Sequence, residues 1–265
     1  MFRNTITRAL GRRKIEAAMM LGVAAISSVG LARNDVAVAE AAVAPAPTSA
    51  PVRYLVEAAS NAASKPTSAA PARTTMGLPN LDHPRVESWV KRFTTDQRGS
   101  FATYLRRMTR YEDMISGKLA DRDMPQGLIF LAMIESGFNP TAKSPVKASG
   151  LWQFMSATGK EYGLKVTRKV DERNNPARST DAALRYLSHL HNRFGSWYLA
   201  AAAYNTGQGR VARIMKQETG KTRGTDADYY RISHRLPQET RDYVPKMIAA
   251  ARIGADPVKY GFRAN

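Results

Sequence analysis

The segment from Pro125 to Asn139 constrains the fold more than any other part of this chain. Residues 128–134, with the sequence LIFLAMI, are apolar on every side of a helix, and a carboxylate, Glu135, follows directly. A helix without a polar face has no side that it can turn to water, so other elements must surround it. The chain therefore has to build its core around this helix.

Apolar residues at helical spacing dominate the rest of the region after residue 80. One face follows the i, i+3, i+4, i+7 pattern of an amphipathic helix and comprises Val86, Trp89, Val90 and Phe93. The same reasoning predicts helices over 179–194, 196–203, 211–215 and 243–251. Convincing alternating strands are lacking, and only 163–172 could hold a small sheet. The sequence therefore predicts a mainly α domain with little or no β-sheet.

The ends of these helices carry recognisable signals. Residues 179–181, Ser-Thr-Asp, are N-capping types, so they are expected to begin one helix. Gly195 is expected to end that helix, and Ser196 is expected to cap the next one. Pro245 lacks a backbone N–H, so it is expected to kink or interrupt the last helix.

Composition changes near residue 80 and divides the chain. All three Trp lie beyond this point, and only two aromatic residues, Phe2 and Tyr54, precede it. A segment that poor in large apolar side chains cannot offset the entropy that ordering costs. We therefore expect the folded domain over 80–265, preceded by an Ala-, Pro-, Ser- and Thr-rich disordered linker over 33–79.

The N-terminus has the features of a secretory signal peptide. A basic start over 3–14 precedes a nearly uncharged stretch over 17–29, and small residues follow. We expect a signal peptide over 1–32, with cleavage after Ala32 or Ala39, and hence export to the periplasm. The apolar run is too short for a transmembrane helix. The alternative is an amphipathic N-terminal helix of a cytosolic protein.

Net charge and the absence of Cys narrow the function classes. The chain carries 40 Lys and Arg against 22 Asp and Glu, a formal charge of +18, of which +13 falls after residue 79. Nucleic acid, acidic lipid surfaces and anionic cell-wall polymers would all attract such a chain. The absence of Cys excludes disulfides, thiol catalysis and Cys metal sites. HExxH motifs, Gly-rich phosphate loops and serine-hydrolase elbows are also absent, so no metal and no cofactor is predicted.

Glu135 is the main candidate for chemistry. A carboxylate at the end of an all-apolar helix is costly to bury in its charged form, and the negative helix C-terminus also favours the neutral form. A carboxyl group that stays protonated near neutral pH can act as a general acid. The alternative is a structural role, in which Glu135 caps the helix or pairs with a nearby Arg or Lys.

Two later segments carry further candidates. Within 147–155, KASGLWQFM, the side chain of Gln153 lies between apolar neighbours and needs a polar partner, whereas Phe154 and Met155 are expected in the core. Trp152 could stack on a sugar ring or pack in the core. Within 199–207, LAAAAYNTG, the hydroxyl of Tyr204 could orient a carboxyl group. Its neighbour Asn205 could bind a sugar or simply cap the helix.

Taken together, these residues show a resemblance to a known family. The sequence of residues 84–255 resembles the catalytic domain of the lytic murein transglycosylases, which belong to the lysozyme-like superfamily (glycoside hydrolase family 23). It is most similar to the membrane-bound D-type enzymes. The ordered motifs that carry the resemblance are Ile134-Glu135-Ser136, Gly150-Leu151-Trp152-Gln153-Phe154-Met155, Ala203-Tyr204-Asn205 with Gly207, and Leu236–Pro245 with Tyr243. The resemblance implies a lysozyme-like helical domain around a substrate cleft.

The resemblance also implies roles for individual residues. It makes Glu135 the single catalytic acid and base. It places Gln153, Tyr204 and Asn205 in the cleft around the scissile sugar. It further implies that Tyr243 orients Glu135 or the substrate, and that Ser136 lies near the site.

The implied reaction cleaves the β-1,4 bond between N-acetylmuramic acid and N-acetylglucosamine in peptidoglycan without water and leaves 1,6-anhydromuramyl ends. Asp171 and Glu172 are expected to be turn and capping residues, so a second catalytic carboxylate is lacking. Two alternatives share the fold: a hydrolytic muramidase and a non-catalytic peptidoglycan-binding domain. A nucleic-acid binder is disfavoured because the basic residues are spread along the chain.

Two features depart from the D-type pattern. The chain has no Cys that could carry a lipid anchor, and it stops at Asn265 without the C-terminal wall-binding repeats of those enzymes. We therefore expect a soluble periplasmic protein, or one held by an uncleaved N-terminus. Its expected partner is the glycan strand of peptidoglycan, and the sequence does not define its oligomeric state.

Overall fold

The computed structural model describes residues 76–78 and 82–263. All of them belong to one compact unit, and a second unit, Ser28–Ala72, lies outside them. The expected signal peptide, 1–32, also lies outside the described residues, as does the linker up to residue 75. The linker prediction extends to residue 79, but Met76–Leu78 packs against the domain, with Leu78 buried and the Met76 carbonyl accepting a hydrogen bond from Gly127.

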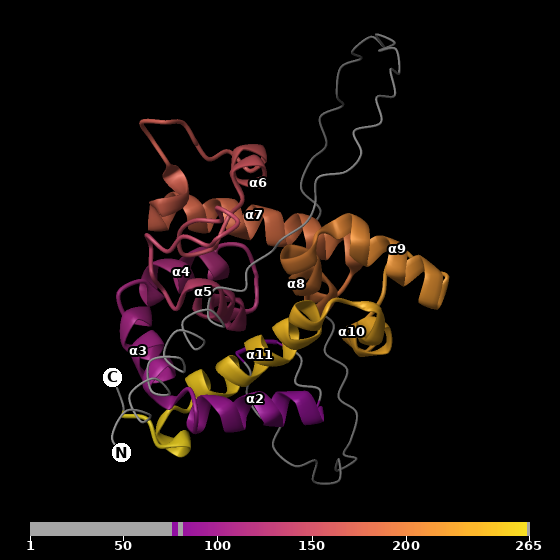
Figure 1. Cartoon of the computed structure of the whole chain (residues 1–265), viewed down its shortest axis with the longest axis horizontal. Helices are drawn as coiled ribbons and strands as arrows, with labels where there is room; N and C mark the ends of the chain where they lie inside the picture. The colour runs from indigo at the N-terminus through magenta and orange to yellow at the C-terminus, as the bar shows by residue number, and fades with distance from the viewer. Residues whose placement is uncertain (1–75, 79–81, 264–265) are drawn as a thin grey trace, which may run out of the picture. The chain divides into compact units, whose positions relative to one another are not determined.

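Helices make up most of the described chain, which confirms the prediction of a mainly α domain. They are α2 (Pro84–Thr94), α3 (Arg98–Met108), α4 (Glu112–Ala120), α5 (Ile129–Ser136), α6 (Ser156–Glu161), α7 (Pro176–Phe194), α8 (Trp197–Thr206), α9 (Gln208–Thr219), α10 (Asp226–Ile232) and α11 (Gln238–Ala255) (Figure 1). Short 3-10 turns occupy Gln126–Leu128, Glu172–Asn174, Ser233–Arg235 and Val258–Tyr260.

Strand pairing in the described residues is limited to isolated bridges. Two of them, Lys143 with Ser149 and Ser149 with Phe154, fold the loop after α5 back on itself. The third joins Val166 to Asp171, so the possible small sheet over 163–172 is reduced to a single bridge. No described helix is both long enough and apolar enough to cross a membrane.

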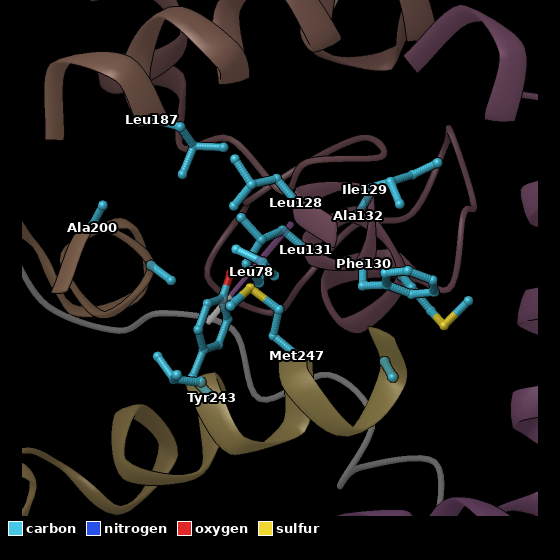
Figure 2. Close-up of a cluster of buried hydrophobic side chains, with 14 of the residues drawn as sticks. Leu78, Leu128, Ile129, Phe130, Leu131, Ala132, Leu187, Ala200, Tyr243 and Met247 are labelled. Atoms are coloured by element: carbon cyan, nitrogen blue, oxygen red, sulfur yellow. The ribbon is translucent and has the colours of Figure 1, made fainter. Parts of the chain in front are cut away.

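The apolar segment that dominates the sequence forms the centre of the core. The side chains of Ile129–Met133 in α5 are buried almost completely, and α5 contacts both α4 and α11. Figure 2 shows this segment between Leu187 of α7 and Met247 of α11, with Ala200 of α8 at its side. The helix α11 packs along α2, as Figure 1 shows, and α8 packs on α7. The expectation that this helix is central and buried among other elements is therefore confirmed.

Pro245 was expected to kink or interrupt the last helix, and it does not interrupt it. The helix α11 runs from Gln238 to Ala255 with Pro245 inside it. A proline at this position removes the N–H that would bond the carbonyl of Arg241, four residues earlier. The hydroxyl of Tyr229 in α10 donates to that carbonyl at 3.0 Å and also to the carbonyl of Thr240 at 2.9 Å. A tertiary contact thus supplies the donor that the proline removed.

The predicted caps are confirmed at two helix ends and wrong at a third. Gly195 ends α7 in the left-handed conformation, and Ser196 caps α8 by accepting a hydrogen bond from the backbone of Leu199. The helix α7 begins earlier than residues 179–181, however. Its N-cap is Asn175, whose side chain accepts from Arg178, and Pro176 is the first helical residue. The Asn-Pro pair is therefore the stronger start signal.

The buried side chain of Arg173 holds the loop between α5 and α6. It pairs with Asp171 and donates to the backbone carbonyls of Lys147 and Phe154 at 2.9 and 3.0 Å. Gly150, inside this loop, has φ +87°, and a Cβ there would lie 1.8 Å from the carbonyl oxygen of Arg173. Only glycine can therefore bring this loop so close to the Arg173 backbone.

We predict that Gly150→Ala destabilises the domain by about 2–4 kcal/mol, since it adds both backbone strain and a steric clash. Thermal or urea unfolding measures the effect. The matched control is Gly99→Ala in α3, where a Cβ meets no atom within 4 Å. This control should leave stability unchanged or raise it by up to about 1 kcal/mol. Equal stability of the two variants would contradict the tight approach at Gly150.

Candidate active site

A cleft with a volume of about 180 Å³ opens at the C-terminal end of α5. Its walls come from α2, α3, α5, α11 and the start of the loop after α5. Apolar and aromatic side chains form one part of the lining, including Phe93, Phe101 and Tyr104. The polar part comprises Gln97, Arg107, Glu135, Ser136, Asn139 and Lys246. The expected substrate cleft is therefore present, and the main candidate residue lines it.

Glu135 sits near the end of α5 with only 6% of its surface exposed. Its Oε1 accepts a hydrogen bond from the hydroxyl of Tyr243 in α11 at 2.5 Å. Figure 2 shows the Tyr243 side chain directed from α11 toward α5. The other oxygen, Oε2, is buried and has no hydrogen-bond partner among the described residues. Glu135 therefore has one satisfied and one unsatisfied oxygen.

Burial raises the pKa of Glu135 to about 8. The Tyr243 hydrogen bond opposes this shift, the charge of Glu239 adds to it, and the charge of Lys246 opposes it. Glu135 is consequently protonated at neutral pH, as expected from the sequence. Because Tyr243 donates to Oε1, the acid proton belongs on Oε2, which is the atom without a protein partner.

Tyr204 lies beside Glu135 but does not donate a hydrogen bond to it. Its hydroxyl donates to the carbonyl of Trp152 at 2.8 Å, and its ring packs on Tyr186. Burial, followed by the nearby Glu135 carboxylate, raises the pKa of Tyr204 well above its ordinary value. The suggestion that its hydroxyl orients the carboxyl group is therefore wrong. Tyr204 instead holds the backbone just before Gln153.

Gln153 has a strained backbone and one unsatisfied buried atom. Its φ is +47°, which is uncommon for a residue other than glycine. Its Nε2 donates to the carbonyls of Ala142 and Gly150 at 3.1 and 2.8 Å, whereas the buried Oε1 has no partner in the described part of the chain. Since Ala142 lines the cleft, Gln153 lies directly behind the cleft wall.

The other residues of the Gly150–Met155 motif divide between core and surface. Phe154 is buried, as expected. Trp152 is also buried, and its ring nitrogen donates to the hydroxyl of Thr180 at 2.9 Å. Met155 was expected in the core, but 38% of its surface is exposed. The loop turns at this point to begin α6, so its last side chain faces out.

Asn205 and Ser136 bond to neighbouring elements. Asn205 Oδ1 accepts from the hydroxyl of Thr240 at 2.7 Å, and its Nδ2 donates to Glu239 at 3.2 Å, so the side chain ties α8 to α11 rather than capping α8. The Ser136 hydroxyl donates to the carbonyl of Leu151 at 2.8 Å and ties α5 to the following loop. Both hold the two sides of the site together.

Lys246 is a charged residue of the site that was missed in the sequence. Lys246 lines the cleft and lies over the ring of Trp89, with its ammonium 5.3 Å from the ring centroid. Burial lowers the pKa of Lys246, while the charge of Glu135 and then that of Glu239 act in the opposite direction. Lys246 comes three positions after Tyr243, a spacing that places both on one side of a helix, and this was the signal that could have found it.

The other carboxylates considered from the sequence have structural roles. Asp171 accepts from the backbone and guanidinium of Arg173, whose hydrogen bond is the main cause that lowers the pKa of Asp171. Glu172 accepts from the backbone of Lys165 at 2.7 Å. In the described residues, no group of three His, Asp or Glu side chains could hold a metal ion. The arrangement around Glu135 is suited to donating a proton and taking one back.

Comparison with known proteins finds similarity to one domain family and to several enzymes over part of their length. Residues 114–226 match the transglycosylase SLT domain. The chain is 39% identical over 193 residues to the membrane-bound lytic murein transglycosylase D of Escherichia coli K12, covering 71% of this chain and 40% of that protein. It is 31% identical over 146 residues to the soluble lytic murein transglycosylase of Salmonella typhimurium, covering 52% of this chain and 22% of that protein. The chain thus spans less than half the length of these relatives.

Among solved structures, the chain is similar to the 70 kDa soluble lytic transglycosylase of Escherichia coli. The TM-score is 0.46 and the sequence identity 27%, over 57% of this chain and 25% of that one.

We predict that Glu135→Gln stabilises the protein more at pH 8.5 than at pH 5. The folded pKa of Glu135 is about 8, whereas an unfolded glutamate titrates near 4.3. Between these values the folded state holds a proton that the unfolded state lacks, so wild-type stability falls as pH rises. The glutamine of the variant does not titrate, so the variant does not lose stability in this way as pH rises. Thermal unfolding of both proteins at both pH values measures the difference, and a pH-independent difference would contradict a neutral Glu135.

Proposed function

We propose that this protein is a lytic murein transglycosylase, because residues 114–226 match the transglycosylase SLT domain. It cleaves the β-1,4 bond between N-acetylmuramic acid and N-acetylglucosamine in peptidoglycan and uses Glu135 as its single acid and base. The observation that carries the proposal is the position of Glu135, which lines the cleft and is kept neutral by burial, with one oxygen free of protein partners.

In the first step, the Oε2 proton of Glu135 moves to the oxygen that bridges the two sugars. The bond between this oxygen and C1 of the muramyl sugar breaks, and an oxocarbenium-like species forms. The substrate acetamido oxygen can share the positive charge. Glu135 becomes a carboxylate, and both the Tyr243 hydroxyl and the Lys246 charge favour this form, as their lowering effect on the Glu135 pKa indicates.

In the second step, the Glu135 carboxylate takes the proton from the C6 hydroxyl of the same muramyl sugar. The O6 atom bonds to C1 and closes the 1,6-anhydro ring. The proton given in the first step returns to Glu135, so the enzyme is restored and no water is consumed. One carboxylate suffices because the substrate provides the nucleophile.

The remaining site residues position the groups that react. Gln153 has an unsatisfied acceptor, Oε1, behind the cleft wall, suited to a hydroxyl or N–H donor of the sugar. The bonds of Ser136 and Tyr204 fix the loop that carries Gln153. Asn205 keeps Glu239 beside the site, where its charge helps to raise the Glu135 pKa.

We also propose that the protein acts in the periplasm after export. The basis is the basic and apolar pattern of residues 1–32. Peptidoglycan lies in the same compartment, so this location brings the cleft to its substrate.

We predict that wild-type protein releases muropeptide ends one water lighter than reducing sugars, measured by mass spectrometry of digested peptidoglycan. Glu135→Gln should lower the rate by at least about 100-fold, because the proton donor is lost. Glu172→Gln makes the same chemical change at the carboxylate that bonds Lys165 and is the control with normal activity. Only ordinary reducing ends would instead identify a hydrolytic muramidase, and full activity of Glu135→Gln would refute the site.

We predict that Tyr243→Phe lowers the maximal rate and moves the alkaline limb of the pH–rate profile to higher pH. The Tyr243 hydrogen bond lowers the pKa of Glu135, so its removal raises that pKa and keeps the acid protonated longer. The rate falls because the carboxylate formed in the first step loses its donor. A profile with an unchanged alkaline limb would show that Tyr243 does not act through Glu135.

A further inference from the structure

A second pocket, with a volume of about 380 Å³, lies outside the cleft of Glu135. It is formed by α9 and by the segment that leads into α11. Arg210, Arg213 and Arg235 line it, together with Gln217 and the apolar side chains of Ile214, Leu236 and Pro237. No carboxylate belongs to this lining. The pocket thus combines three guanidinium groups with an apolar floor, since Ile214 and Leu236 are buried.

The positive charge of this pocket is only partly balanced. Arg235 lies 3.5 Å from Glu218, and the same carboxylate lies 3.6 Å from His234. Arg210 donates to the neutral hydroxyl of Thr206 at 3.2 Å. Arg213 is exposed and makes no ion pair within the described part of the chain. Because arginine keeps its charge at all physiological pH values, the pocket is suited to an anion.

The pocket adjoins the candidate active site through two short connections. Thr206, which accepts from Arg210, is the neighbour of Asn205 in α8. Pro237 in the pocket lining precedes Glu239, the partner of Asn205, by two residues. Two residues span at most about 7 Å. The arginine pocket therefore lies just beyond the Asn205–Glu239 pair, at one end of the site.

We propose that this arginine pocket binds carboxylates of the peptide stem of peptidoglycan. The proposal rests on the proposed function, in which a muramyl sugar occupies the site near Glu135. The stem extends from the lactyl group of that sugar, and four residues reach up to about 14 Å. Its side-chain and terminal carboxylates match the planar guanidinium groups of Arg210, Arg213 and Arg235. Neutral sugar hydroxyls would not balance the positive charge of three guanidinium groups, whereas carboxylates would.

The test compares two substrates, intact peptidoglycan and glycan strands whose stems an amidase has removed. Wild-type protein should cleave the stem-bearing substrate with the higher kcat/KM. The double variant Arg213→Gln/Arg235→Gln should reduce the ratio of the two values about five- to tenfold, since each exposed arginine–carboxylate pair contributes a few-fold to binding. Both arginines are exposed, so the fold should tolerate their exchange.

The double variant Arg168→Gln/Lys169→Gln is the matched control. It also removes two positive charges, from exposed residues in the loop between α6 and α7, well apart from α9 in Figure 1, and should keep the wild-type ratio. An equal loss in this control would show that overall charge, not the pocket, is responsible. An unchanged ratio in the double variant would overturn the proposal. If the wild-type protein cleaves neither substrate, the proposed function itself is refuted.

A binding measurement identifies the ligand chemistry. Released stem peptide, titrated into the full chain, should shift NMR signals of α9, and the double variant should weaken this binding. The same peptide with its carboxylates amidated should not bind. Equal binding of inorganic phosphate would contradict a carboxylate-specific pocket and indicate a general anion site.

Discussion

The hydrogen bond from Tyr243 to Glu135 is the interaction on which the rest of the site depends. It joins α5, the helix that the core surrounds, to α11, and Tyr243 is the only hydrogen-bond partner that the buried Glu135 carboxyl group has among the described residues. A charged carboxylate would be costly here, and the neutral form is favoured. The bond in turn requires α11 to stay helical through Pro245, which it does because Tyr229 bonds the carbonyl of Arg241. The proton on Glu135 is thus linked to packing in α10.

Several candidate residues donate hydrogen bonds to backbone carbonyls of the loop after α5. Ser136 and Tyr204 bond to the carbonyls of Leu151 and Trp152, and Gln153 bonds with its own Nε2 to two more. These bonds fix the loop against α5. Two buried polar atoms, the protonated Oε2 of Glu135 and the acceptor Oε1 of Gln153, have no partners in the described residues. Polar groups held in place before a ligand arrives need little reorganisation when it binds.

The sequence predicted the central helix and the neutral Glu135 because both follow from one local pattern, an apolar run that ends in a carboxylate. The caps at Gly195 and Ser196 are likewise local. The errors involve contacts between distant residues. The continuity of α11 depends on Tyr229, and the role of Tyr204 depends on the Trp152 carbonyl, 52 residues away. Lys246 was overlooked because its importance comes from packing α11 against α2 and α5.

The net charge of +18 illustrates why composition could not identify a partner. Some of the cations are structural: Arg252 is buried against Asp82 and Glu87, and Arg173 holds the loop around Gly150. Others line the cleft with Glu135 or the arginine pocket of α9. The charges of Arg252 and Arg173 are balanced by carboxylates inside the domain, so they add little to the electrostatic potential at its surface. The charge that a substrate meets is therefore set by a few residues at two neighbouring sites, and their positions follow from the fold.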